Sequence, residues 1–143
     1  SSAGGHLACL AAGGCRSEAM PDLKCVINYC APATINEFVK HLTGAERKES
    51  SVMKLLGGDH EKTENFAEEA TVTNWIKPGY PPTLSIHGDE DTIVPIAQSE
   101  RVTEAVEAVG SEAKFHIVEG SQHRINEEKV REVVKAFLSK YFC

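Results

Sequence analysis

The first residues of the chain place a serine in a setting that suits nucleophilic catalysis. Ser2 is followed by Ala3, Gly4 and Gly5. A serine on a sharp strand-to-helix turn exposes its hydroxyl, and small neighbours let the backbone pass without clashes. The sequence therefore predicts that Ser2 lies on a nucleophile elbow, with the strand that feeds it and the first glycine of the motif upstream of residue 1. The backbone N–H of Ala3 would then donate a hydrogen bond to an oxyanion.

A serine hydroxyl is a weak nucleophile until an imidazole accepts its proton and a carboxylate orients that imidazole. Clusters of serine and glycine are more often turns or linkers, so these partners decide whether Ser2 has a chemical role. Two segments offer them in the chain order nucleophile, acid, histidine. The segment 87–91 (HGDED) follows a short apolar run, and the segment 120–123 (GSQH) closes another strand-like pattern. His123 is the candidate base.

Three neighbouring carboxylates, Asp89, Glu90 and Asp91, could each orient this histidine on chemical grounds alone. Asp89 is the best placed to stabilise the turn after the strand by accepting backbone N–H groups. Near these carboxylates, no second histidine or cysteine stands at ligand spacing from His87, so neither a metal site nor a cofactor is expected. Structural roles are expected for the other histidines, which are His6, His60, His87 and His116.

Together, these blocks resemble the signature blocks of α/β-hydrolase esterases. The resemblance rests on Ser2–Ala8, His87–Pro95 and Gly120–His123, and it is strongest to the feruloyl/acetyl-xylan esterase-like branch of bacterial carboxylesterases. Ser51–Gly58 and Val72–Pro82 also resemble that branch. The resemblance runs nearly end to end and implies the C-terminal half of such an enzyme.

The resemblance implies a Ser-His-Asp triad in which Ser2 is the nucleophile, Asp91 the acid and His123 the base, with the N–H of Ala3 in the oxyanion hole. It implies hydrolysis of a small-molecule or carbohydrate-linked ester through an acyl-enzyme. One departure is the pair 124–125 (RI) after His123, where relatives often carry a glycine and an aromatic residue. No segment resembles the His-Gly-Gly loop that supplies the second oxyanion donor, so the isolated chain is expected to be weak or inactive.

Two alternatives remain open. One is a serine peptidase of the prolyl-oligopeptidase type, whose acid and histidine blocks are similar. Such peptidases usually carry a tyrosine where Ala3 stands, which favours the esterase. The other is a non-catalytic fragment or interaction protein that has only inherited the three residues.

Composition sets broader limits. With 41% hydrophobic and 25% charged residues the chain is typical of globular proteins, and a net charge of −6 without a basic block argues against nucleic acid as a partner. No apolar run reaches the roughly 18 residues of a membrane span. Compartment and oligomeric state stay open. The cysteines lack metal-ligand spacing and are expected to be mostly buried free thiols: Cys9, Cys15, Cys25, Cys30 and Cys143.

Alternating helical and strand patterns predict an α/β fold, a three-layer αβα sandwich with about three mostly parallel strands. The whole chain, 1–143, is predicted to be one partial hydrolase domain, with a cap-like helical segment over 34–77. A helix over 4–12 and a strand over 23–30, with an exposed edge, come first. Two later helices carry apolar stripes at helical spacing, one on Val102, Ala105, Val106 and Val109 and one on Val130, Val133, Val134, Phe137, Leu138 and Tyr141.

Overall fold

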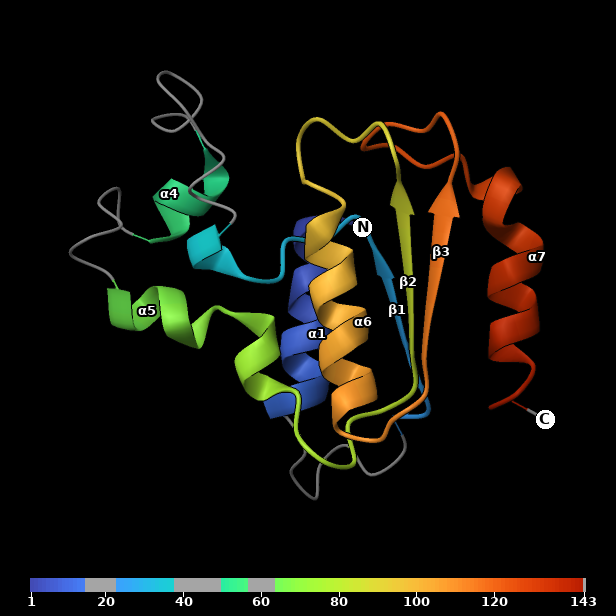
Figure 1. Ribbon diagram of the computed structural model, residues 1–143, viewed down its shortest axis with the longest axis horizontal. Coiled ribbons are helices and arrows are strands. Elements are labelled where there is room, and N and C mark those ends of the chain that lie inside the picture. Colours follow the sequence, from blue (N-terminus) through green and yellow to red (C-terminus); the bar gives the residue numbers. More distant parts are fainter. Residues whose placement is uncertain (15–22, 38–49, 57–63, 143) are drawn as a thin grey trace.

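The computed structural model describes residues 1–14, 23–37, 50–56 and 64–142 of the chain. Its elements alternate between helix and strand in the way the sequence predicts (Figure 1). In chain order they are α1 (Ala3–Gly14), β1 (Val26–Tyr29), α4 (Ser51–Leu55), α5 (Glu64–Glu69), the 3₁₀ helix η2 (Val72–Trp75), β2 (Thr83–Gly88), α6 (Ala97–Ala108), β3 (Ala113–Val118) and α7 (Glu127–Leu138).

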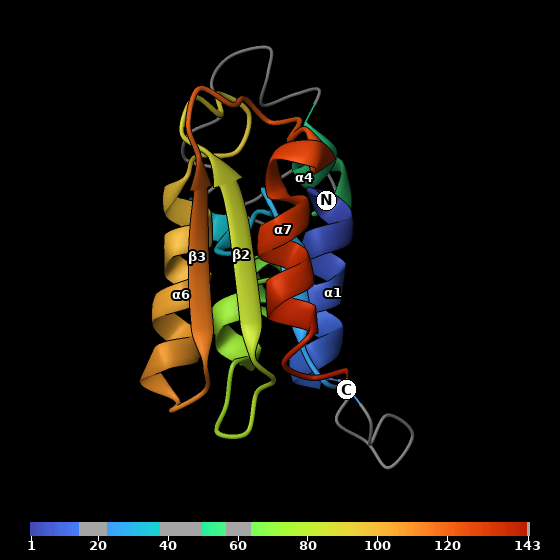
Figure 2. The same ribbon diagram turned by 90° about the vertical axis from the view of Figure 1, so that its right-hand side faces the viewer.

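The strands form one parallel sheet in the order β1-β2-β3. Val26 of β1 pairs with Thr83 of β2, which pairs with Ala113 of β3. Helices α1 and α6 cover one face of the sheet and α7 covers the other, as Figure 1 and the turned view of Figure 2 show. The predicted α/β fold and its three-layer αβα arrangement are confirmed.

The central strand β2 is buried along its whole length, because it has a strand on each side and a helix layer over each face. On the α1 and α6 face the core includes Cys9, Val26, Val72, Val102 and Val106. On the α7 face it includes Leu84, Ile86, Val118, Val130 and Phe137. The apolar stripes predicted for the last two helices therefore supply one layer each.

The first strand is shorter than predicted. The sequence pattern covers 23–30, whereas β1 spans Val26–Tyr29, and Leu23 and Lys24 are exposed. Cys30 ends the extended backbone because its φ of +46° lies in the left-handed region. As predicted, β1 is a terminal strand of the sheet.

Part of the predicted cap-like segment 34–77 forms a small core of its own. Ile35, Met53, Leu56, Ala67 and Ala70 are buried together, and Val52 packs against them. By contrast, the aromatic side chains of Phe66 and Trp75 are 45% and 39% exposed. Residues 38–49 and 57–63, with His60, lie outside the described residues. Whether this segment caps the site stays a prediction.

Cys9, Cys25 and Cys30 are free thiols, and the first and last of these are buried. Cys15 and Cys143 lie outside the described residues. Among the described residues, no helix combines the length and the apolar character needed to cross a bilayer.

Candidate active site

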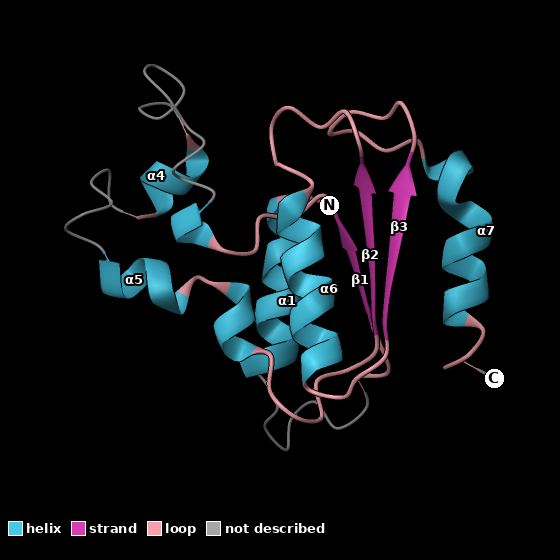
Figure 3. Cartoon of the chain, in the orientation of Figure 1, coloured by secondary structure: helices cyan, strands magenta, loops and turns pink. Residues whose placement is uncertain are grey.

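The three residues singled out in the sequence come together at one end of the sheet. Figure 3 shows the loops after β2 and β3 meeting at the carboxyl ends of the strands, close to the N-terminus. His123 Nε2 lies 3.0 Å from Ser2 Oγ, and His123 Nδ1 lies 2.8 Å from Asp91 Oδ2. Parallel strands bring these segments together because their carboxyl ends share one edge of the sheet.

Ser2 lies on a strained turn. Its φ of +51° is in the left-handed region, which costs free energy for any residue with a Cβ. The backbone holds it there: the N–H of Ser2 donates to Tyr29 O at 2.7 Å, and its carbonyl accepts from the N–H of His6 at 3.0 Å. A Cβ on Gly5 would lie 2.8 Å from Asn28 Oδ1, so glycine lets α1 approach β1 closely. The turn projects the hydroxyl of Ser2 toward His123, as an elbow would.

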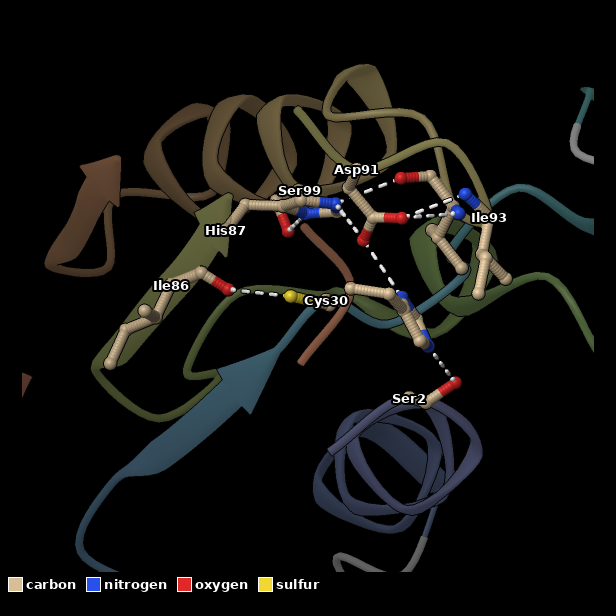
Figure 4. Close-up of polar contacts among 9 residues, drawn as sticks. Ser2, Cys30, Ile86, His87, Asp91, Ile93 and Ser99 are labelled. Carbon is tan, nitrogen blue, oxygen red and sulfur yellow. Dashed lines mark hydrogen bonds and ion pairs between the residues drawn. The ribbon is translucent and has the colours of Figure 1, made fainter. Parts of the chain in front are cut away.

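Asp91 is held by donors on both of its oxygens. Oδ1 accepts from the N–H groups of Ile93 at 2.8 Å and Val94 at 2.9 Å, while Oδ2 faces His123 (Figure 4). The side chain has no exposed surface. Burial acts to raise the pKa of Asp91, but the N–H of Val94, the ring of His123 and the N–H of Ile93 outweigh it and leave the pKa below its ordinary value. The carboxylate is therefore ionised at neutral pH.

His87 contacts the same carboxylate from the side of the core. It is fully buried, and its Nε2 lies 2.9 Å from Val94 O and 3.1 Å from Asp91 Oδ2. A carbonyl only accepts, so we assign the proton to Nε2, and Nδ1 then accepts from the hydroxyl of Ser99 at 2.7 Å. The sequence indicated a packed structural residue. The structure adds that His87 holds Asp91, a contact that the four-residue spacing in HGDED allows but does not require.

The other two carboxylates of this segment do not reach His123. Asp89 Oδ1 accepts from the N–H of Gly120 at 2.8 Å, which is the turn-stabilising role expected of it, and Glu90 is exposed. The two loops lie so close that a Cβ on Gly88 would be 2.0 Å from Ser121 O. Among these three acids, Asp91 is the one whose carboxylate contacts His123.

Two other histidines lie away from this cluster. His6 is buried in α1 and its Nε2 lies 2.7 Å from Ala70 O, which ties the helix to the segment before η2. His116 lies on β3 and pairs with Ile86 of β2. Both have structural positions, as the sequence indicated.

A pocket of about 600 Å³ opens beside Ser2 and His123. Arg124 and Ile125, the two residues that depart from the expected pattern, line it. The remaining lining residues of the pocket are Ser1, Tyr29 and Glu127.

Ala3 is the first residue of α1, directly after Ser2. The N–H of a first helical residue has no acceptor within the helix and lies at the positive end of the helix dipole. The backbone of Ala3 therefore has the character that the predicted oxyanion donor requires.

Comparison with known proteins agrees with this fold and arrangement. The family model BD-FAE, which describes an α/β-hydrolase esterase domain, matches residues 1–106. The chain belongs to the BD-FAE family. No curated protein sequence matches it significantly.

Several solved structures are similar to the chain. The bifunctional GH43-CE protein of Bacteroides eggerthii is 26% identical with a TM-score of 0.78, over 96% of this chain and 22% of that protein. A truncated carbohydrate esterase from gut microbiota is 20% identical with a TM-score of 0.77, over 99% of this chain and 58% of that one. A puromycin-hydrolyzing peptidase of Mycobacterium tuberculosis is 23% identical with a TM-score of 0.77, over 98% of this chain and 20% of that protein. The chain spans only part of each, and the last two show the fold alone.

Proposed function

We propose that this chain carries the nucleophile, base and acid of a serine hydrolase that cleaves carboxylic esters. The observation that supports it is the chain of contacts from Ser2 Oγ to His123 Nε2 at 3.0 Å and from His123 Nδ1 to Asp91 Oδ2 at 2.8 Å. Each distance is within hydrogen-bond reach, and each residue has the type its role requires. Membership of an esterase domain family supports the same proposal.

In the proposed mechanism, Ser2 Oγ attacks the ester carbonyl while His123 Nε2 accepts the hydroxyl proton. The tetrahedral intermediate collapses, and the departing alcohol takes that proton from His123, which leaves an acyl-enzyme on Ser2. A water molecule, deprotonated by His123, then releases the acid. Asp91 stays ionised throughout, keeps the ring proton on Nδ1 and stabilises the imidazolium. This mechanism requires no metal or cofactor.

The oxyanion is proposed to accept a hydrogen bond from the N–H of Ala3, at the start of α1. This position suits the task because the first N–H groups of a helix lack partners and carry partial positive charge. Loss of one oxyanion donor costs on the order of 10²–10³ in kcat. Because no segment of the sequence resembles the His-Gly-Gly loop that supplies the second donor in such esterases, we infer that the chain by itself hydrolyses esters slowly.

The substrate is proposed to be a small or carbohydrate-linked ester. The pocket beside Ser2 has a volume of about 600 Å³, and it carries the polar groups of Tyr29, Arg124 and Glu127. Polar groups of this kind suit an alcohol part with hydroxyls more than a long acyl chain. The 26%-identical neighbour is described as a bifunctional GH43-CE protein, which supports the same substrate class. We also propose that 34–77 caps this site within a single domain over 1–143.

The proposal is tested by hydrolysis of p-nitrophenyl acetate and by labelling with a fluorophosphonate. Ser2→Ala is expected to lower turnover by at least about 10³-fold and to abolish labelling. Ser1→Ala is the matched control, because Ser1 is adjacent and lines the same pocket. The Ser1→Ala variant should retain both ester turnover and fluorophosphonate labelling. Equal turnover in the unaltered chain and Ser2→Ala, or labelling that survives in Ser2→Ala, would refute the proposal.

A serine peptidase is the second candidate, because peptidases of the prolyl-oligopeptidase type have acid and histidine blocks similar to those of this chain. It would use the same three residues. Cleavage of a proline-containing peptide without cleavage of the aryl ester would support the peptidase. A chain that neither turns over these substrates nor reacts with the fluorophosphonate would be a non-catalytic member of the family.

A further inference from the structure

A thiol lies against the base and the acid of the candidate active site. Cys30 stands at the carboxyl end of β1, where it is fully buried (Figure 4). One ligand atom from each of Cys30, Asp91 and His123 lies within 4.8 Å of the other two. In the part of the chain that the structure describes, no other group of three His, Cys, Asp or Glu side chains brings its ligand atoms this close together. Residue spacing along the sequence did not indicate it, because the three residues come from the ends of three different strands.

We propose that Cys30, Asp91 and His123 form a Zn²⁺ site, and that the bound ion switches the active site off. The ligands would be Cys30 Sγ, Asp91 Oδ2 and His123 Nδ1, with a water molecule as the fourth. Sulfur, oxygen and imidazole nitrogen are the donors that zinc takes in proteins, in a tetrahedral arrangement. Binding does not depend on the proposed function, whereas inhibition rests on it.

The distances require small movements only. Three atoms that are at most 4.8 Å apart share a point no more than about 2.8 Å from each of them. Zinc bonds are about 2.0–2.3 Å long, so each ligand atom would move by at most about 0.5–0.8 Å. Side-chain rotation supplies such a shift without moving the strands.

The surroundings of the cluster already hold its carboxylate in place. If zinc takes Asp91 Oδ2, the other oxygen keeps the N–H groups of Ile93 and Val94 at 2.8 and 2.9 Å. Such outer contacts orient a ligand and raise metal affinity. His123 is the exposed member of the cluster, with 18% of its side chain accessible, and it lines the pocket beside Ser2. An ion would reach the buried thiol from that pocket.

Proton balance explains the inhibition. Zinc binds a cysteine as the thiolate, so binding must displace the thiol proton of Cys30 into solvent. The proton on His123 Nδ1 moves to Nε2, which faces Ser2 Oγ at 3.0 Å. A protonated Nε2 cannot accept the proton of Ser2. Each ion bound therefore releases one proton to solvent.

The test uses the full chain and variants at Cys30. Cys30→Gly removes the thiol and suits the φ of +46° at this position, so it should fold. Cys30→Ser is a second variant that keeps a side chain. Cys9→Ala is the matched control, because Cys9 is also a buried free thiol with a pKa of about 11 but does not belong to the cluster.

Zinc binding is measured by calorimetry, and Co²⁺ is used to detect thiolate-to-metal charge-transfer absorption. We expect one ion per chain, a charge-transfer band, and affinity at least 10–100-fold weaker in both Cys30 variants but unchanged in Cys9→Ala. The inactive Ser2→Ala variant should bind equally well, which separates this result from failure of the proposed function. Absence of the band, or unchanged affinity in Cys30→Gly, would overturn the site. Zinc binding that leaves the p-nitrophenyl acetate turnover of the chain unchanged would overturn the inhibition.

Discussion

Replacing Asp91 with asparagine tests the roles assigned to the acid and the base. In Asp91→Asn the amide carbonyl oxygen can stay on the N–H groups of Ile93 and Val94, which now bond Asp91 Oδ1 at 2.8 and 2.9 Å. The amide NH₂ then falls at the position of Oδ2, facing His123. Since this group donates, His123 Nδ1 must accept, and the ring proton moves to Nε2 beside Ser2. The imidazole is then in the wrong tautomer to act as a base.

The size of the effect follows from this change of tautomer. The equivalent replacement in a serine protease triad lowers kcat by about 10⁴, which corresponds to about 5.5 kcal/mol in the activation barrier. The free energy of unfolding should change much less, by about 1–2 kcal/mol, because the N–H of His87 loses Asp91 as an acceptor but keeps Val94 O at 2.9 Å. In Asp91→Asn, kcat should therefore fall strongly while the free energy of unfolding changes little.

The assay is hydrolysis of p-nitrophenyl acetate, with urea unfolding of the same preparations. Asp89→Asn is the matched control, because Asp89 stands two residues earlier and its Oδ1 accepts only from the N–H of Gly120. An asparagine there retains that acceptor, so turnover should change less than about threefold. The reasoning is refuted if Asp91→Asn stays within tenfold of the unaltered chain, or if Asp89→Asn is equally slow.

Three further predictions concern the loops around the site. Ser2→Gly should abolish hydrolysis yet stabilise the fold by roughly 0.5–1 kcal/mol, because glycine suits the φ of +51°; a lower melting temperature would contradict this. Gly88→Ala should cost at least about 2–3 kcal/mol in urea unfolding and slow hydrolysis, because its Cβ would lie 2.0 Å from Ser121 O and push two loops apart. Since the pKa of Asp91 is lower in the folded chain, its contribution to stability is present above the unfolded value of about 4 and is lost as pH falls through the folded value. In urea unfolding between about pH 5 and pH 2, the Asp91→Asn variant should therefore lose less stability than the unaltered chain.

The regular elements could be predicted because each has a local cause. Val102 and Val106 lie one helical turn apart and are both buried in α6, and Val130 and Phe137 of the second apolar stripe are both buried in α7. The end of β1 could not be predicted. Its apolar pattern continues to Cys30, whose N–H still donates to Ile86 O of β2 at 3.0 Å, but the φ of +46° at Cys30 turns the backbone out of the extended conformation.

Within the candidate site, the sequence by itself determined which chemistry was available and in which order: a serine on a glycine-rich turn, a carboxylate after one strand and a histidine after another. It left three carboxylates open on chemical grounds, and only the resemblance favoured Asp91. The tertiary structure alone decided that Asp91 contacts both His123 and His87, and that Cys30 lies beside them. The physical reason is the parallel sheet, which gathers the carboxyl ends of strands that are distant in sequence at a single edge, where spacing along the chain no longer says which side chains meet.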